Sequence, residues 1–184
     1  MIIGLTGKNA SGKGEAANYL KTKGFIYYSL SGIIREEATK RNLEHSRDNL
    51  INLGNELRKK FGSDYLAKQT NKKIKQESRK NNNFVIDSIR SPYEAKELMK
   101  NKDFVLVGID APIELRFKRL LERNRIGDAK TLEYFKLQEQ RENLKSDVNQ
   151  QLDKTFKMSQ KIILNDGSLK ELHKKIDKLL ENLK

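Results

Sequence analysis

The stretch "GLTGKNASGKGEAANYL", residues 4–20, holds the residues whose types and spacing most clearly indicate a chemistry. Gly7 and Gly12 allow backbone amides to turn toward one anion, and Lys13 supplies a positive charge at the start of a helix. The spacing is that of a phosphate-binding loop, although Gly14 stands where serine or threonine is usual. The predicted nucleotide contacts in this loop are Gly7, Lys8, Asn9, Ala10, Ser11, Gly12, Lys13, Gly14 and Glu15.

Arginines stand near the ends of several predicted elements. Arg35 follows the stretch "FIYYSL", and Arg90 follows Asp87 in "VIDSIRSPYEA". Arg119 and Arg123 have the spacing that places two residues on one helix face. Phosphoryl transfer requires positive groups around a spreading negative charge, so all four arginines are candidate site residues. A surface ion pair is the alternative interpretation for Arg35 and Arg90, and a solvated basic face is the alternative for the other two.

Short apolar strands alternate with helical patterns around these residues. Strands are predicted in "MIIGLTG", "FIYYSL", "NFVIDSIR", "DFVLVGID" and "KIILND", and helices are predicted to start at Pro92 and Pro112. This alternation favours an α/β fold with a parallel sheet between two helical layers. Ligands of such sheets bind beyond the carboxyl ends of the strands, where Asp87 and Arg90 are expected to meet the phosphate loop.

The chain is expected to form one domain over residues 1–184, since its length and its 36% hydrophobic residues suffice for one core. No internal repeat or linker divides it. Two long helical excursions between strands, residues 30–82 and 123–159, are natural places for segments that close on a substrate.

Composition narrows the chemistry further. The chain has no cysteine, and its two histidines are far apart in the sequence, so any metal ion must be held mainly by oxygen ligands. We expect no signal peptide and no membrane span, hence a cytoplasmic protein. The formal net charge of +13 attracts any polyanion, but lysine-rich stretches are more often solvated helix faces.

The loop and the arginine segments together resemble the P-loop nucleoside monophosphate kinases. "GKNASGKG" resembles the adenylate kinase loop, which also ends in Gly-Lys-Gly and whose magnesium is reached through nucleotide phosphates and water. Gly14 therefore favours this branch of phosphate-loop enzymes, whereas Glu15 departs from its usual threonine. The resemblance implies a five-stranded parallel sheet, a helical acceptor-binding region, a lid, and ATP with Mg²⁺.

The same resemblance implies roles for individual residues. Arg35 and Arg90 would hold the acceptor phosphate, and Asp87 would organise magnesium through water. Arg119 and Arg123 would begin the lid and contact donor and migrating phosphoryl group, with Arg125 and Arg141 as further lid arginines, Arg141 on the acceptor side. "LNDG", with Asn165 and Gly167, would lie near the donor adenine. Its alternative interpretation is an ordinary helix start capped by Asp166 or Ser168.

Comparison of two related kinase families limits the choice of acceptor substrate. Dephospho-CoA kinases have a stretch that resembles Asp-x-Asp-x-x-x-Arg after the second strand. This chain has Ser29 and Ser31 at the two acidic positions and keeps Arg35. Phosphorylation of a hydroxyl benefits from a carboxylate base, but a phosphate acceptor is already ionised. We therefore favour a nucleoside or deoxynucleoside monophosphate. The alternatives are dephospho-CoA, with Asp87 as base, and a nucleic-acid-associated ATPase; the oligomeric state stays open.

Overall fold

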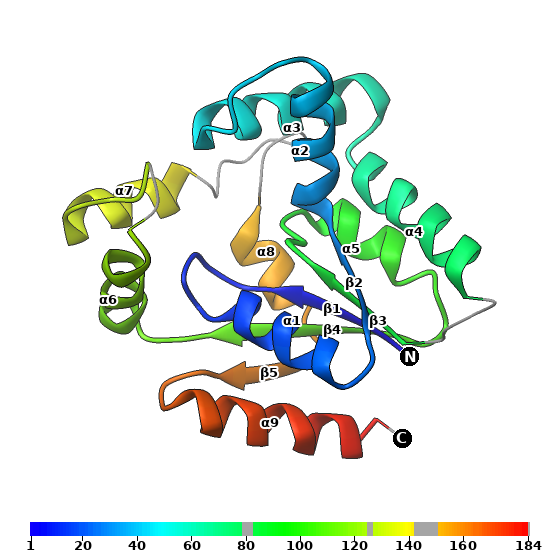
Figure 1. Cartoon of the computed structure of the whole chain (residues 1–184), viewed down its shortest axis with the longest axis vertical. Coiled ribbons are helices and arrows are strands. Elements are labelled where there is room, and N and C mark those ends of the chain that lie inside the picture. Colours follow the sequence, from blue (N-terminus) through cyan, green and yellow to red (C-terminus); the bar gives the residue numbers. More distant parts are fainter. Residues whose placement is uncertain (79–82, 125–126, 142–150, 184) are drawn as a thin grey trace.

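A computed structural model describes residues 1–78, 83–124, 127–141 and 151–183 (Figure 1). Its five strands form one sheet in the order β2-β3-β1-β4-β5, and every adjacent pair is parallel. The strands are β1 (Ile2–Thr6), β2 (Ile26–Ser29), β3 (Phe84–Asp87), β4 (Phe104–Asp110) and β5 (Lys161–Leu164). The five predicted strands and the α/β fold with helices on both faces are confirmed.

The register of the sheet brings the candidate residues to one edge. Ser29 at the end of β2 pairs with Asp87 at the end of β3, and β1 between β3 and β4 ends at Thr6, directly before the phosphate loop. Because all strands run the same way, these carboxyl ends meet on one side of the molecule.

Helices follow the strands and cover both faces of the sheet (Figure 1). The helices are α1 (Lys13–Thr22), α2 (Leu30–Lys40), α3 (Arg47–Phe61), α4 (Tyr65–Glu77), α5 (Pro92–Leu98), α6 (Ile113–Arg123), α7 (Leu132–Arg141), α8 (Leu152–Lys157) and α9 (Leu169–Glu181). Pro92 occupies the start of α5 as predicted, behind a capping box formed by Ser91 and Glu94. Ser168 and Glu171 form a second capping box at α9.

Alternate residues of the strands pack into two separate cores. Ile3 and Val85 face α1 and α9, whereas Ile2, Phe84 and Ile86 face α2, α3, α4 and α5. Such burial of both faces explains why the strands are continuously apolar. A third, smaller cluster holds Leu120, Ala129 and Phe135 of the α6–α7 region.

The two predicted excursions contain α2, α3 and α4 in one case and α7 and α8 in the other. Among the helices of the described segments, none is both long enough and apolar enough to cross a membrane.

Candidate functional site

The phosphate loop joins the end of β1 to the start of α1. Lys13 opens α1, and its Nζ donates to the carbonyl oxygens of Gly7 and Lys8, each at 2.8 Å. The lysine ammonium is thereby held against the loop at the positive end of α1. Ala10 has a φ of 58°, a left-handed conformation that is costly for a residue with a side chain. The predicted strand, loop and helix context of a phosphate site is present.

Close packing disfavours any side chain at two glycines of the loop. A Cβ at Gly7 would overlap the carbonyl oxygen of Ile109, and one at Gly12 would overlap the Asn165 side chain. Both residues also have positive φ, 143° and 103°. Asn165, which is 5% exposed, donates from Nδ2 to the carbonyl oxygen of Ser11 at 2.9 Å. The end of β5 thus braces the loop.

Two polar atoms of the loop are buried without a hydrogen-bond partner among the described residues: Asn9 Nδ2 and Ser11 Oγ. Buried polar groups are normally satisfied, so unsatisfied donors call for an explanation. Both can donate to oxygen atoms, and together with Lys13 they fit a phosphate group.

Gly14 and Glu15 are exposed on the first turn of α1. No described atom lies within 4 Å of a Cβ built at Gly14, so the packing of the protein does not exclude a serine or threonine there. The packing of the fold therefore does not explain why position 14 lacks a hydroxyl group. Within the described segments, no three His, Cys, Asp or Glu side chains gather into a metal site.

The predicted lid arginines reach the phosphate loop and its brace. Arg119 donates to the main-chain oxygen of Asn165 at 3.1 Å. Arg123 donates to both carboxylate oxygens of Asp128, each at 2.8 Å, and to Asn9 Oδ1 at 3.1 Å. Arg123 thus joins α6, the following turn and the loop, which a solvated helix face would not do.

Arg116 of α6 belongs to the same group. It is 3% exposed, donates to the main-chain oxygens of Ala111 and Asn9, and forms an ion pair with Glu139 of α7. Its guanidinium also lies over the ring of Phe135. Arg116 therefore fastens α7 and the phosphate loop to α6.

A cluster of hydroxyl groups occupies the ends of β2 and β3. Ser29 Oγ lies 2.9 Å from Ser31 Oγ, and Ser88 Oγ lies within 3.4 Å of both. Arg35 donates to Ser31 Oγ at 2.8 Å and has no carboxylate within ion-pair distance in the described segments. Its alternative interpretation as half of a surface ion pair is not what the structure has.

Asp87 stands beside this serine cluster. Its Oδ1 accepts from the Ser88 amide at 2.6 Å, and Ser88 itself has a positive φ of 65°. The Tyr27 hydroxyl lies 3.5 Å from Asp87 Oδ2. Burial raises the pKa of Tyr27, and the negative charge of Asp87 adds to this effect. Left-handed backbone at a residue with a side chain, as at Ser88, is found preferentially at functional sites.

Arg90 is placed by a buried ion pair that the sequence did not reveal. Glu94 is fully buried, and its Oε1 accepts from Arg58 Nε and Nη2 at 3.0 and 2.8 Å. Its Oε2 accepts from the amides of Arg90 and Ser91 at 3.0 and 3.1 Å. The Arg90 carbonyl accepts from the Gln151 amide at 2.9 Å. The turn that carries Arg90 is thus fixed to both α3 and the start of α8. The only available sequence signal was the "SPYE" capping pattern.

The structure brings most predicted residues to one edge of the sheet, with some exceptions. Gly167 precedes the N-cap of α9, and Ser168 caps that helix as one of the two interpretations stated. Asn165 faces the phosphate loop with its side chain engaged. Arg125 lies outside the described residues. Arg141 ends α7, and its side chain also lies outside what the structure describes.

Comparison with known proteins relates this chain to a described domain family and to archaeal proteins. A family model described as an AAA domain matches residues 6–136. A UPF0200 protein of Thermococcus gammatolerans is 31% identical over 186 residues, covering 100% of this chain and 95% of that protein. A UPF0200/UPF0201 protein of Archaeoglobus fulgidus is 32% identical over 184 residues, but the match covers 99% of this chain and only 55% of that relative.

Among solved structures, the shikimate kinase of Aquifex aeolicus superposes with a TM-score of 0.55 at 20% identity, covering 99% of this chain and 97% of that one. This likeness concerns the fold. It confirms the predicted P-loop kinase fold with its five-stranded parallel sheet.

Proposed function

This chain belongs to the AAA-domain family and to the UPF0200 proteins, and on that premise we propose that it phosphorylates a nucleoside or deoxynucleoside monophosphate with ATP. Its P-loop kinase-like fold supports nucleotide-dependent phosphoryl transfer in general. In the proposed reaction an acceptor phosphate oxygen attacks the terminal phosphorus of ATP. The bond from that phosphorus to the bridging oxygen breaks, and ADP and the acceptor diphosphate leave.

The donor end of the site is supported by the phosphate loop. Lys13 and the loop amides would hold the donor phosphates, and Asn9 Nδ2 and Ser11 Oγ offer two further donors. Asp87 would hold Mg²⁺ through water, because the chain offers no hydroxyl at position 14. Bound Mg²⁺ would neutralise charge on the donor phosphates.

The single observation that carries the choice of acceptor is the serine cluster beside Arg35. At the ends of β2 and β3 three hydroxyls lie together, and two of them, Ser29 and Ser31, stand at the two acidic positions. Arg35, which has no carboxylate within ion-pair distance among the described residues, donates to Ser31. Uncharged Ser29 and Ser31 do not repel a phosphate dianion as two carboxylates would. Asp87 beside the cluster is the carboxylate that would have to remove a proton from a sugar hydroxyl. This supports an acceptor that is already phosphorylated.

The lid side supplies the charge for the transfer step. We propose that Arg119 and Arg123 contact the donor and the migrating phosphoryl group when the region of residues 123–159 closes. Closure would exclude water and align the two reacting atoms. Arg123 then exchanges its contacts with Asp128 and Asn9 for phosphate oxygens.

The first experiment incubates the purified protein with Mg-ATP and, separately, each ribo- and deoxyribonucleoside monophosphate and dephospho-CoA. Formation of ADP together with a nucleoside diphosphate supports the proposal and identifies the base. Formation of CoA would refute it and would make Asp87 the candidate base. ATP hydrolysis without any phosphorylated product would also refute it.

Substitution of the acceptor arginines tests their assignment. Arg35→Ala and Arg90→Ala should each raise KM for the monophosphate at least tenfold, which is the effect of losing about 1.4 kcal/mol of binding, and leave KM for ATP nearly unchanged. Arg41→Ala is the matched control, because Arg41 follows the same helix but pairs with Glu37 and Glu56. Equal losses for both nucleotides would show that the two arginines are assigned to the wrong end.

A further inference from the structure

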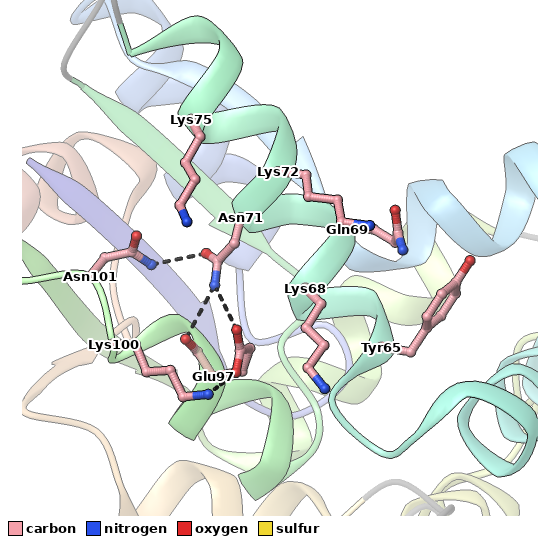
Figure 2. Close-up of a pocket in the computed structure, with 9 residues that line it drawn as sticks. All are labelled: Tyr65, Lys68, Gln69, Asn71, Lys72, Lys75, Glu97, Lys100 and Asn101. Carbon is pink, nitrogen blue, oxygen red and sulfur yellow. Dashed lines mark hydrogen bonds and ion pairs between the residues drawn. The ribbon is translucent and has the colours of Figure 1, made fainter.

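A surface pocket of about 370 Å³ lies between α4 and the end of α5, and none of its lining residues belongs to the candidate active site (Figure 2). Asn71 of α4 donates to the carbonyl oxygen and to the carboxylate of Glu97, both at 3.2 Å, and accepts from Asn101 at 2.9 Å. These bonds join the two helices and fix the floor of the pocket.

Positive charge exceeds negative charge in this α4–α5 pocket. Four lysines and one glutamate line it. Lys100 pairs with Glu97, and Lys68 pairs with Asp64 at 3.0 Å. Lys72 and Lys75 are exposed and have no carboxylate within ion-pair distance among the described residues. The pocket therefore attracts anions.

The lysines of α4 form a row rather than a point. Lys68, Lys72 and Lys75 share one helix face. At 1.5 Å of rise per residue, the row extends over roughly 10 Å along the helix. A single phosphate group would need only one of these contacts. A row of this length suits successive phosphates, which follow each other about every 3.4 Å along one strand of a nucleic acid duplex and farther apart in an extended strand.

An aromatic pair joins the end of α3 to the start of α4. Phe61 is 47% exposed, and its ring stacks on Tyr65, which lines the pocket, with 4.8 Å between ring centroids. Lys60 lies over the Phe61 ring at 5.2 Å. Packing of the core does not require such an exposed ring. Aromatic faces next to a basic groove are the usual platform on which unpaired bases stack.

We propose that the α4–α5 pocket, together with the Phe61–Tyr65 pair, binds single-stranded nucleic acid. The α4 lysines contact the phosphates, and a base stacks on Phe61. This binding activity is separate from phosphoryl transfer, and it would give part of the net charge of +13 a polyanionic ligand. A lipid surface fits less well, because an interfacial helix inserts an apolar face that projects outward, whereas these lysines line a concavity.

The test measures binding of fluorescein-labelled single-stranded RNA and DNA homopolymers by anisotropy between about 50 and 200 mM salt. The variant Lys72→Gln/Lys75→Gln removes two charges from the pocket, and Lys174→Gln/Lys178→Gln removes two exposed charges from α9 as the matched control. With a salt slope of about 0.7 per phosphate contact, the pocket variant should bind about 25-fold more weakly at 0.1 M salt, with a slope smaller by about 1.4. The α9 variant should bind nearly as the unaltered protein does.

The stacking contact is tested separately. Phe61→Leu keeps apolar volume but removes the ring, and it should weaken binding roughly 5-fold or more, whereas Phe61→Tyr should retain it. The lysine variants alter exposed side chains, so their thermal unfolding should stay unchanged. Phe61→Leu also loses the stacking on Tyr65 and should lower Tm by a few degrees at most, whereas Phe61→Tyr should not.

Four results would overturn the proposal: equal losses in the two double-lysine variants, tighter binding to duplex than to single strands, displacement of the strand by Mg-ATP, or binding to anionic lipid vesicles without binding to either strand. Acceptor phosphorylation should persist in Lys72→Gln/Lys75→Gln. Failure of the nucleic-acid proposal is therefore distinguishable from failure of the kinase proposal.

Discussion

Adding one methyl group at each of three glycines isolates the contact by which β5 braces the phosphate loop. Gly14 has neither a positive φ nor a neighbour within 4 Å of an added Cβ. Gly24 has a positive φ of 87°, and no described atom lies within 4 Å of a Cβ added there. Gly12 has both a φ of 103° and an overlap with Asn165. The series Gly14→Ala, Gly24→Ala and Gly12→Ala therefore adds one physical effect at a time.

The expected free energies of unfolding follow from these three situations. Gly14→Ala should stabilise α1 by about 0.5–1 kcal/mol, because alanine loses less entropy in a helix. Gly24→Ala should cost about 1–2 kcal/mol, the penalty of a left-handed conformation. Gly12→Ala carries that penalty and also displaces Asn165, whose bond to the Ser11 carbonyl is lost at a cost of about 1–3 kcal/mol. Its total is about 2–5 kcal/mol.

Thermal unfolding followed by circular dichroism measures the series, with about 2–4 °C expected per kcal/mol in a chain of this size. Gly14→Ala should raise Tm by a few degrees, and Gly12→Ala should lower it by about 4–20 °C. Equal changes in Tm for Gly12→Ala and Gly24→Ala would refute the bracing by Asn165. A decrease for Gly14→Ala would refute the open space at that position.

Three further predictions concern charged residues. Lys13→Ala should abolish phosphoryl transfer while the circular dichroism spectrum stays that of the folded protein, since this loop lysine contributes no core packing and loses its bonds to the loop. Normal turnover would contradict the mechanism. Glu94→Gln should lower the free energy of unfolding in urea by about 3–5 kcal/mol, because Arg58 is left buried without its carboxylate. Adding Arg58→Met should recover much of this lost stability. A Glu94→Gln variant as stable as the unaltered protein would contradict this reasoning. The hydrogen bond from Lys23 lowers the pKa of Asp177 below its ordinary 3.8. The stability that Asp177→Asn removes should therefore be present above pH 3.8 and disappear as the pH falls through the lowered pKa. A difference in stability between the two proteins that grows in acid would contradict this prediction.

Much of the architecture was predictable because it depends on local patterns. Apolar runs alternating with helical periodicity predicted the five strands, and the glycine and lysine spacing predicted the phosphate loop between β1 and α1. Pro92 and Ser168 marked the starts of their helices. Each of these signals lies within a few residues of the feature that it predicts, so the order of the strands in the sheet was not needed.

The amino-acid sequence by itself thus determined the fold class, the phosphate loop, the position of Asp87 at the end of β3 and that of Arg35 on the helix after β2. Only the tertiary structure decided that Asn165 braces Ser11, 154 residues away, and that Arg116 is buried against the loop. It also gathered Ser29, Ser31 and Ser88 into one cluster, because β2 and β3 lie side by side. Such contacts join residues far apart in the chain, and they depend on the order and register of the strands. Local sequence patterns do not encode this order and register.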